Sequence, residues 1–204
     1  QNCSLQPVTI ESLNTKSKSE QPPLPYNLLK LQKDAARKFG YSLQQTLDIT
    51  QSLRENHGLI TYNRSDCQYL SDEHFEEAQD VLNAVAQTAS ILQGAIAKSD
   101  PTIKSRAFNS EKLSAHHGII PTDTVGDLNK LTDSEQKVYL LIARAYIAQF
   151  HPKYTYDSTE IISNVNGFKF KTVTKTETDL GWKNLYKNDV GNAELQEDED
   201  TQSL

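Results

Sequence analysis

Residues 132–150 read TDSEQKVYLLIARAYIAQF, and this stretch predicts the central helix of the fold. Thr132 and Glu135 have the spacing of a capping box, in which two side chains satisfy free amides at the start of a helix. From residue 138 onward the stretch is apolar on nearly every side, so we expect the helix to lie in the core. Pro152 ends it, because proline cannot continue a helix.

Two shorter helices are predicted in residues 27–57. Apolar side chains recur at helical spacing in the first of them, and Gly40 is well placed to stop it, because glycine readily adopts the left-handed conformation that ends many helices. Ser42 and Gln45 form a second capping box, which opens the next helix. Gly58 provides its stop.

A third helical region is predicted to begin at Ser71 and to run to about Lys98. Its first turn is acidic and its apolar residues form one stripe, with a break expected near Thr88. Residues 101–129 lack clear periodicity, so we interpret them as an ordered loop.

β segments flank this helical block. Residues 7–18 alternate loosely and are rich in β-branched side chains, which favours a strand, and the prolines in 22–25 then break regular structure. Segments 159–165 and 168–173 flank an Asn-Gly pair, the strongest signal for a type I′ hairpin turn. We therefore predict an α+β fold, predominantly α, with a helical domain inserted into a partial antiparallel β domain. The predicted divisions are an N-terminal β piece (1–25), a helical domain (26–152), a returning β hairpin (153–190) and an acidic disordered tail (191–204).

The composition indicates a soluble protein with 36% hydrophobic and 24% charged residues. No run approaches the roughly 18 apolar residues of a membrane span, and the N-terminus lacks the apolar core of a signal peptide, so we expect a cytoplasmic protein without membrane contact. Cys3 and Cys67 lack metal-ligand spacing and are expected to be free thiols. Because the chain begins with Gln1 and contains no methionine, we expect it to be a piece of a longer protein.

The formal net charge of −6 is concentrated at the C-terminal end. Residues 192–204 contain five acidic side chains and no Lys or Arg, so the rest of the chain carries 21 basic and 22 acidic side chains. A body this close to neutral can bind nucleic acid only through a local basic surface.

The stretch GLITYNRSD, residues 58–66, places a phenol and a guanidinium two positions apart. In an extended segment Tyr62 and Arg64 would project from the same face and could address one ligand. A phenol is a poor nucleophile at neutral pH unless a nearby cation favours the phenolate, and an arginine can also bind a phosphate bidentately. In a chain with nine tyrosines, such a pair taken alone is more often structural.

The stretch SAHHGIIPT, residues 114–122, presents two adjacent histidines before a glycine, an apolar pair and a proline. An imidazole held on such a turn can donate a proton or bind a phosphate oxygen near neutral pH. The simpler alternative is that one histidine is exposed and the other packs.

Together the two stretches resemble the active-site signatures of the type IA DNA topoisomerases, especially the topoisomerase III branch. The segment PLPYNLLKLQ at 23–32, the AARKFG at 35–40, and Phe168 and Phe170 followed by Gly181-Trp182 also resemble that family. Order and spacing agree over roughly residues 7–186.

The resemblance implies a role for each matched residue. Tyr62 is the expected nucleophile that forms a 5′-phosphotyrosyl link, Arg64 is expected to steady the scissile phosphate, and His116 is expected to assist cleavage. A one-residue slip in the match would give the last role to His117. The residues expected to contact DNA are Thr61, Arg64, Ser65, Asp66 and His117.

The family also uses a Toprim domain, which holds Mg²⁺ on an Asp-x-Asp pattern and a separate glutamate. No Asp-x-Asp followed by alternating strands and helices is present here, since Asp198 and Asp200 belong to the acidic tail. We therefore expect Mg²⁺ in the parent enzyme only and no metal site in this chain.

The resemblance implies that the chain carries the tyrosine domain with flanking parts of the β gate domain. Its expected partners are single-stranded DNA and the remaining domains of the parent. The chain is expected to be monomeric and inactive alone, while the parent relaxes negative supercoils or decatenates DNA.

Two alternatives compete with this interpretation. The first two predicted helices resemble a helix-turn-helix, so the chain could be a DNA-binding regulator that reads bases with Gln44, Gln45, Gln51 and Arg54. That alternative leaves residues 114–122 and the β flanks unexplained. A noncatalytic module whose acidic tail recruits a basic partner is the second alternative, although a solvated terminal segment explains the tail more simply.

Overall fold

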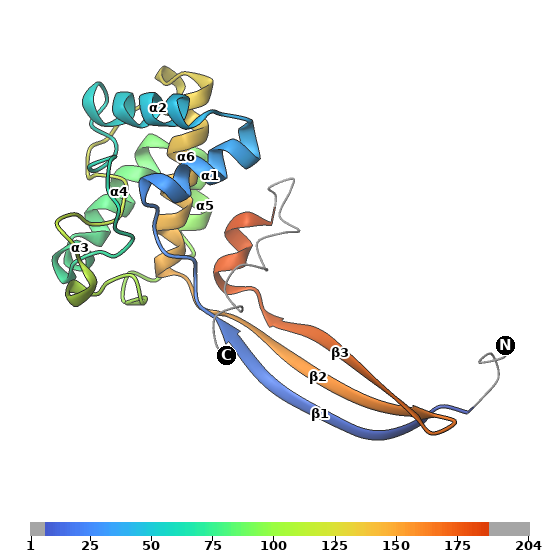
Figure 1. Cartoon of the computed structure of the whole chain (residues 1–204). Helices are drawn as coiled ribbons and strands as arrows, with labels where there is room; N and C mark the ends of the chain where they lie inside the picture. Colours follow the sequence, from blue (N-terminus) through green and yellow to red (C-terminus); the bar gives the residue numbers. More distant parts are fainter. Residues whose placement is uncertain (1–6, 188–204) are drawn as a thin grey trace. The chain divides into compact units, whose positions relative to one another are not determined.

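The structure is a computed structural model that describes residues 7–187. Cys3 and the predicted acidic tail lie outside the described residues. The described chain divides into two compact units, one formed by 7–21 with 153–181 and the other by 22–152 with 182–187. One unit consists of strands and the other is mainly helical (Figure 1).

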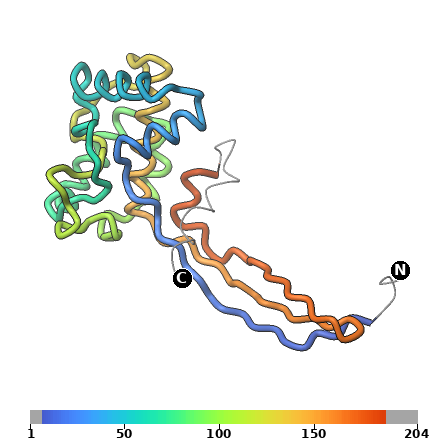
Figure 2. The backbone as a smooth tube through the Cα atoms, in the orientation of Figure 1, coloured from blue at the N-terminus to red at the C-terminus, as the bar shows by residue number. Residues whose placement is uncertain are grey.

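The first unit is a three-stranded antiparallel sheet in the order β1-β2-β3. Its strands are β1 (Thr9–Glu20), β2 (Tyr154–Val165) and β3 (Phe168–Asp179). Asn166 and Gly167 both have positive φ, 52° and 85°, as a type I′ turn requires. The chain reverses tightly between β2 and β3 in Figure 2. The predicted hairpin is confirmed, and its strands are longer than predicted because polar Thr and Lys positions continue the ladder.

The second unit is helical. Its helices are α1 (Leu28–Phe39), α2 (Leu43–Glu55), α3 (Asp72–Glu76), α4 (Ala78–Thr88), α5 (Gln93–Ile96) and α6 (Asp133–Ile147). Short 3₁₀ turns occur at Ser90–Leu92, Ser110–Lys112, Leu128–Lys130, Ala148–Phe150 and Gly181–Tyr186. Most of α6 is buried, and α1 and α2 pack against it, so the predicted core helix is confirmed. The mainly helical α+β class with an antiparallel sheet is likewise confirmed.

Side-chain caps fix where these helices begin. Both hydrogen bonds of the predicted capping boxes at Ser42 and Thr132 are present. Ser71 caps α3, as predicted, but its box is completed by the imidazole of His74 in place of the usual Glu or Gln. Gly40 ends α1 with φ 72°, as predicted.

The predicted helix at 71–98 is more interrupted than expected. The break near Thr88 is present, and a second one separates α3 from α4. At that break the Glu77 amide is shared between the carbonyls of Glu73 and Phe75, which tightens the turn.

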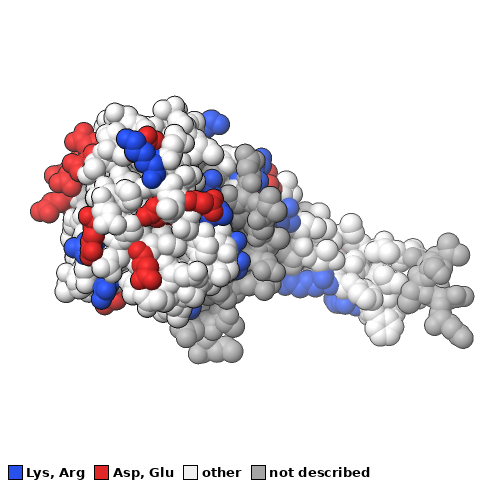
Figure 3. Space-filling view, turned by 90° about the horizontal axis from the view of Figure 1, so that it is seen from above, with Lys and Arg blue, Asp and Glu red and all other residues white. Residues whose placement is uncertain are grey.

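Charged side chains of both signs are interspersed on the face of the helical unit shown in Figure 3. This agrees with the nearly balanced charge of the chain apart from residues 192–204. The face drawn in Figure 3 therefore carries no broad field of one sign of charge.

Candidate active site

The two motifs singled out in the sequence lie side by side. The Thr61 amide donates to the Ile120 carbonyl at 2.9 Å, and the Ile120 amide donates to the Thr61 hydroxyl at 3.1 Å. The Thr122 amide also donates to the carbonyl of Leu59 at 3.1 Å. Leu59, Ile60 and Ile120 are almost fully buried, so apolar packing holds the paired segments together. Residues 59 positions apart in sequence are thereby joined immediately before Tyr62.

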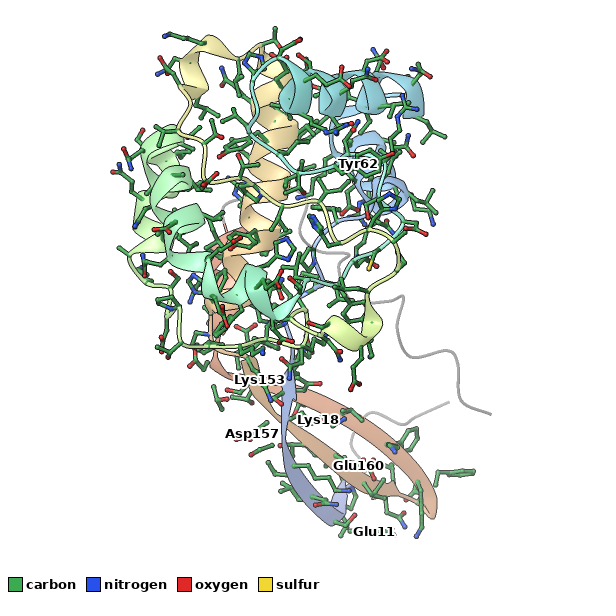
Figure 4. All side chains as sticks on the ribbon, turned by 90° about the vertical axis from the view of Figure 1, so that its left-hand side faces the viewer. Glu11, Lys18, Tyr62, Lys153, Asp157 and Glu160 are labelled. Atoms are coloured by element: carbon green, nitrogen blue, oxygen red, sulfur yellow. The ribbon has the colours of Figure 1, made fainter. Side chains whose placement is uncertain are left out.

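Tyr62 lies in the helical unit, on the segment that follows α2 (Figure 4). Its ring stacks on the imidazole of His116, with ring centroids 4.8 Å apart and planes 25° from parallel. The guanidinium carbon of Arg54 is 4.9 Å from the centroid of the same ring. The phenol is partly exposed. A tyrosine with an imidazole and a guanidinium at its ring, open to solvent, is suited to receive a phosphate.

His116 is further held by a small polar cluster. Its Nδ1 lies 3.8 Å from Oδ1 of Asp66, and the Ser114 hydroxyl donates to that same carboxylate oxygen at 3.2 Å. The Ser114 oxygen also accepts from the His116 amide at 3.3 Å. Ser114 was not singled out in the sequence, and only its position two residues before His116 pointed to it.

The two adjacent histidines point to different neighbours. His117 packs against His74, with ring centroids 4.3 Å apart, and its Nδ1 lies 2.9 Å from the carbonyl of Gly118. Burial, with a smaller contribution from His117, lowers the pKa of His74 to about 4. One histidine thus packs, as the simpler alternative expected, while the exposed one stacks on Tyr62.

The extended geometry predicted for Tyr62 and Arg64 is wrong. Residues 63 and 64 form a turn. Asn63 is buried there, and its amide donates to the Thr50 hydroxyl at 3.1 Å, which bends the chain between the two side chains. The exposed Arg64 donates instead to Oε1 of Gln51 at 3.4 Å. The cation over the ring is Arg54, which the sequence suggested only as a base-reading residue.

The structure gives Ser65 and Thr61 local roles. The Ser65 side chain is buried, and its hydroxyl accepts from the Cys67 amide at 3.1 Å. Thr61 uses its hydroxyl on Ile120 and Gly118. Their predicted contacts with DNA would have to replace these bonds, and those contacts remain predictions.

The three glutamines of the helix-turn-helix alternative make side-chain hydrogen bonds within the chain, and Arg54 contacts the Tyr62 ring. Gln44 donates to Asp48 at 2.7 Å, and Gln45 completes the capping box of α2. Gln51 accepts from Arg64, and Arg54 covers Tyr62.

Among residues 7–187, no group of three or more His, Cys, Asp or Glu side chains is placed to hold a metal ion. Cys67 is a free, buried thiol. No helix in the described part of the chain is both long and apolar enough to cross a membrane.

The sequence model of the DNA topoisomerase family matches residues 1–203, and the chain belongs to this family. The likeness to type IA topoisomerases inferred from the Tyr62 and His116 stretches is thereby confirmed.

The particular relatives are DNA topoisomerase 3 proteins. That of Vibrio cholerae is 42% identical over 180 residues, covering 88% of this chain and 28% of the relative. That of Salmonella typhimurium is 40% identical over 196 residues, covering 96% and 29%. The fold is similar to that of full-length topoisomerase I from Thermotoga maritima, with a TM-score of 0.65 and 21% identity over 96% of this chain and 32% of that one. The chain thus spans just over a quarter of the length of these curated relatives.

Proposed function

We propose that this chain is the tyrosine-bearing part of a type IA topoisomerase that cuts and reseals one strand of DNA. The observation that carries the proposal is the stack of Tyr62 on His116, at a joint that brings two distant motifs together. Its support is the family membership of the chain and the partial exposure of the phenol.

In the proposed cleavage step, the Tyr62 hydroxyl loses its proton and its oxygen bonds to the phosphorus of a phosphodiester. The bond between phosphorus and the 3′ oxygen breaks, and that oxygen takes up a proton as the 3′-hydroxyl leaves. A 5′-phosphotyrosyl link results. Because one phosphoester replaces another, the strand can be resealed by the reverse reaction without an external energy source.

His116 is the proposed group that moves a proton in this step. Within residues 7–187 its Nε2 has no hydrogen-bond partner, whereas its Nδ1 side faces Asp66. An imidazole oriented through one nitrogen keeps the other free for the substrate. Arg64 is the proposed clamp of the scissile phosphate. Its contact with Gln51 is long enough at 3.4 Å to be exchanged for a bidentate bond to phosphate.

The rest of the proposal concerns the longer protein. The helical residues 26–152 are proposed to be inserted into a β gate domain, to which residues 1–25 and 153–190 contribute. Mg²⁺ is proposed to be held by a Toprim domain outside this chain, so the chain alone should not cut DNA. The proposed substrate is single-stranded DNA, the setting cytoplasmic, and the chain monomeric. The longer protein would relax negative supercoils or decatenate DNA.

The test is covalent adduct formation by the full-length protein on a labelled single-stranded oligonucleotide with Mg²⁺ in the buffer. Tyr62→Phe should abolish the adduct, because the ring remains but the attacking oxygen is lost. Tyr69→Phe is the matched control, since this partly exposed tyrosine lies in the same segment beside Lys112. An adduct that survives Tyr62→Phe would refute the proposal.

The roles of the two histidines are tested in the same assay. Replacing His116 by Ala should slow adduct formation by about a hundredfold, the usual scale of a positioned proton-transfer group. The same change at His117 should slow it less, because His117 packs on His74. If His117→Ala slowed adduct formation as much as His116→Ala or more, the proton-transfer role could not be assigned to His116.

A further inference from the structure

One face of α2 contacts both arms of the tyrosine motif. Gln51, Arg54 and Glu55 are spaced three and four residues apart, so they share a side of the helix. Arg54 lies over the ring of Tyr62, and Gln51 accepts from Arg64. The Gln51 amide nitrogen also donates to Glu55 at 3.1 Å, which orients its oxygen toward the arginine. The nucleophile and the proposed clamp are therefore both held by one helix.

Arg54 differs from Arg37, another arginine of the helical unit, in that the hydrogen-bond donors of its guanidinium are not engaged by a neighbouring side chain of the described residues. Its side chain is exposed, and within residues 7–187 it makes no hydrogen bond or ion pair. Arg37 on α1, by contrast, is paired with Asp34 of its own helix at 2.9 Å. A guanidinium that rests on an aromatic face keeps its edge donors available, and those donors match a phosphate in geometry and charge.

Arg54 is placed to contact a phosphate that approaches the Tyr62 hydroxyl. The hydroxyl of a tyrosine lies at one end of its ring, so a cation over the ring stands beside any phosphate that approaches that hydroxyl. A cation–π contact at an exposed site contributes only about 0.5–1 kcal/mol. The contact orders the arginine without committing its donors.

We infer that Arg54 is a second phosphate-binding residue of the tyrosine site, which holds the ring of Tyr62 and binds the single-strand backbone at or next to the phosphate that Tyr62 attacks. This inference rests on the proposed function and adds to it a residue on α2. The sequence suggested Arg64 both as the cation near the phenol and as the phosphate ligand. In this inference Arg54 is the cation at the ring, and Arg64 binds phosphate from the turn.

The binding experiment uses full-length protein carrying Tyr62→Phe, which keeps the ring but cannot cut. Affinity for a single-stranded oligonucleotide is measured between 50 and 200 mM salt. Adding Arg54→Ala should weaken binding and reduce the slope of log affinity against log salt by about 0.7, the value for one phosphate contact on a single strand. Arg54→Lys keeps the charge and should keep the slope. Arg37→Ala removes an arginine that is already paired and should change neither quantity.

The rate experiment uses the protein with Tyr62 intact. Arg54→Ala should slow adduct formation by about tenfold, the scale of one charge-assisted hydrogen bond, with an intermediate rate for Arg54→Lys. If Arg54→Ala matches Arg37→Ala in both slope and rate, the inference is overturned. A slower rate with an unchanged salt slope would also overturn it, because Arg54 would then only position the ring.

Failure of this inference can be told apart from failure of the proposed function. If Tyr62→Phe abolishes the adduct while Arg54→Ala has no effect, only the role of Arg54 is lost. If the adduct survives Tyr62→Phe, the proposed function fails, whatever Arg54 does. Arg54 is exposed, so its variants should keep the urea midpoint of the parent protein, which checks that they fold.

Discussion

Acidification from pH 7.5 to 5.0 should destabilise the helical unit through His74. In the fold, burial and the nearby His117 lower the pKa of His74 to about 4, against about 6.5 for an unperturbed histidine. The folded chain therefore keeps this ring neutral at a pH where the unfolded chain protonates it. The stability that His74 confers is fully present above pH 6.5 and is lost as the pH falls toward 4.

The hydrogen bonds of His74 give the physical reason. Its Nδ1 accepts from the Ser71 amide at 3.2 Å and lies 2.6 Å from the Ser71 hydroxyl, which completes the capping box of α3. A proton on Nδ1 would remove that acceptor and place a positive charge beside His117 and near the start of a helix.

The folded and unfolded pKa values of His74 determine how much free energy of unfolding is lost on acidification. A shift from 6.5 to about 4 corresponds to a loss of about 2 kcal/mol between pH 7.5 and 5.0. His74 is only partly buried, so solvent screening reduces this, and we expect a loss of about 1 kcal/mol.

The assay compares the parent chain with His74→Gln by urea unfolding at both pH values. Glutamine is a standard partner in a capping box and does not titrate, so the variant should lose about 1 kcal/mol less on acidification. His151, whose pKa burial also lowers, is present in both proteins and cancels in the difference. An NMR titration of the His74 ring reports its pKa directly. Equal losses in the two proteins, or a ring that titrates near 6.5, would refute the reasoning.

Three further predictions concern stability and the site. A Cβ on Gly118 would lie 3.1 Å from the backbone oxygen of Gln68, so Gly118→Ala should cost about 1–3 kcal/mol by urea unfolding and slow adduct formation. Gly40→Ala meets no atom within 4 Å but must adopt φ 72°, so its thermal stability should fall by about 1 kcal/mol, whereas Gly40→Asn should cost less. Thr132→Ala removes a cap and a donor to Glu135, so about 1 kcal/mol should be lost at pH 7. Burial raises the pKa of Glu135, yet hydrogen bonds from Ser52 and Thr132 outweigh it and leave that pKa lowered, so the Thr132 penalty should shrink as the pH falls below 4.5.

Features set by nearby residues could be predicted from the sequence. The capping boxes at Ser42 and Thr132, the stop at Gly40 and the turn at Asn166-Gly167 each depend on a few consecutive residues, and all four form as predicted. The core position of α6 followed from its apolar surface. These features depend on local hydrogen bonding and on burial, and both can be recognised from a short stretch of sequence.

Features set by distant contacts could not be predicted in this way. The turn at residues 63–64 depends on the bond between Asn63 and Thr50, which lies on another element. No spacing rule within residues 58–66 contains that contact. Arg54 likewise reaches Tyr62 only because the chain folds back along α2 after Gly58, so the same arginine that suggested base reading in a helix-turn-helix lies at the tyrosine instead.

Thr61 shows why the residues beside the proposed nucleophile, Tyr62, need not contact substrate. Its amide and hydroxyl both bond to Ile120, so the backbone entering Tyr62 is fixed from one side. Asn63 fixes the backbone leaving it through Thr50. The chain is therefore clamped immediately before and after a side chain that remains partly exposed. Such an arrangement keeps the phenol oxygen in one place while leaving its approach open, which is what an in-line attack on a phosphate demands. We therefore expect Thr61 to act by holding the backbone of the proposed nucleophile, through the bond that its hydroxyl accepts from the Ile120 amide.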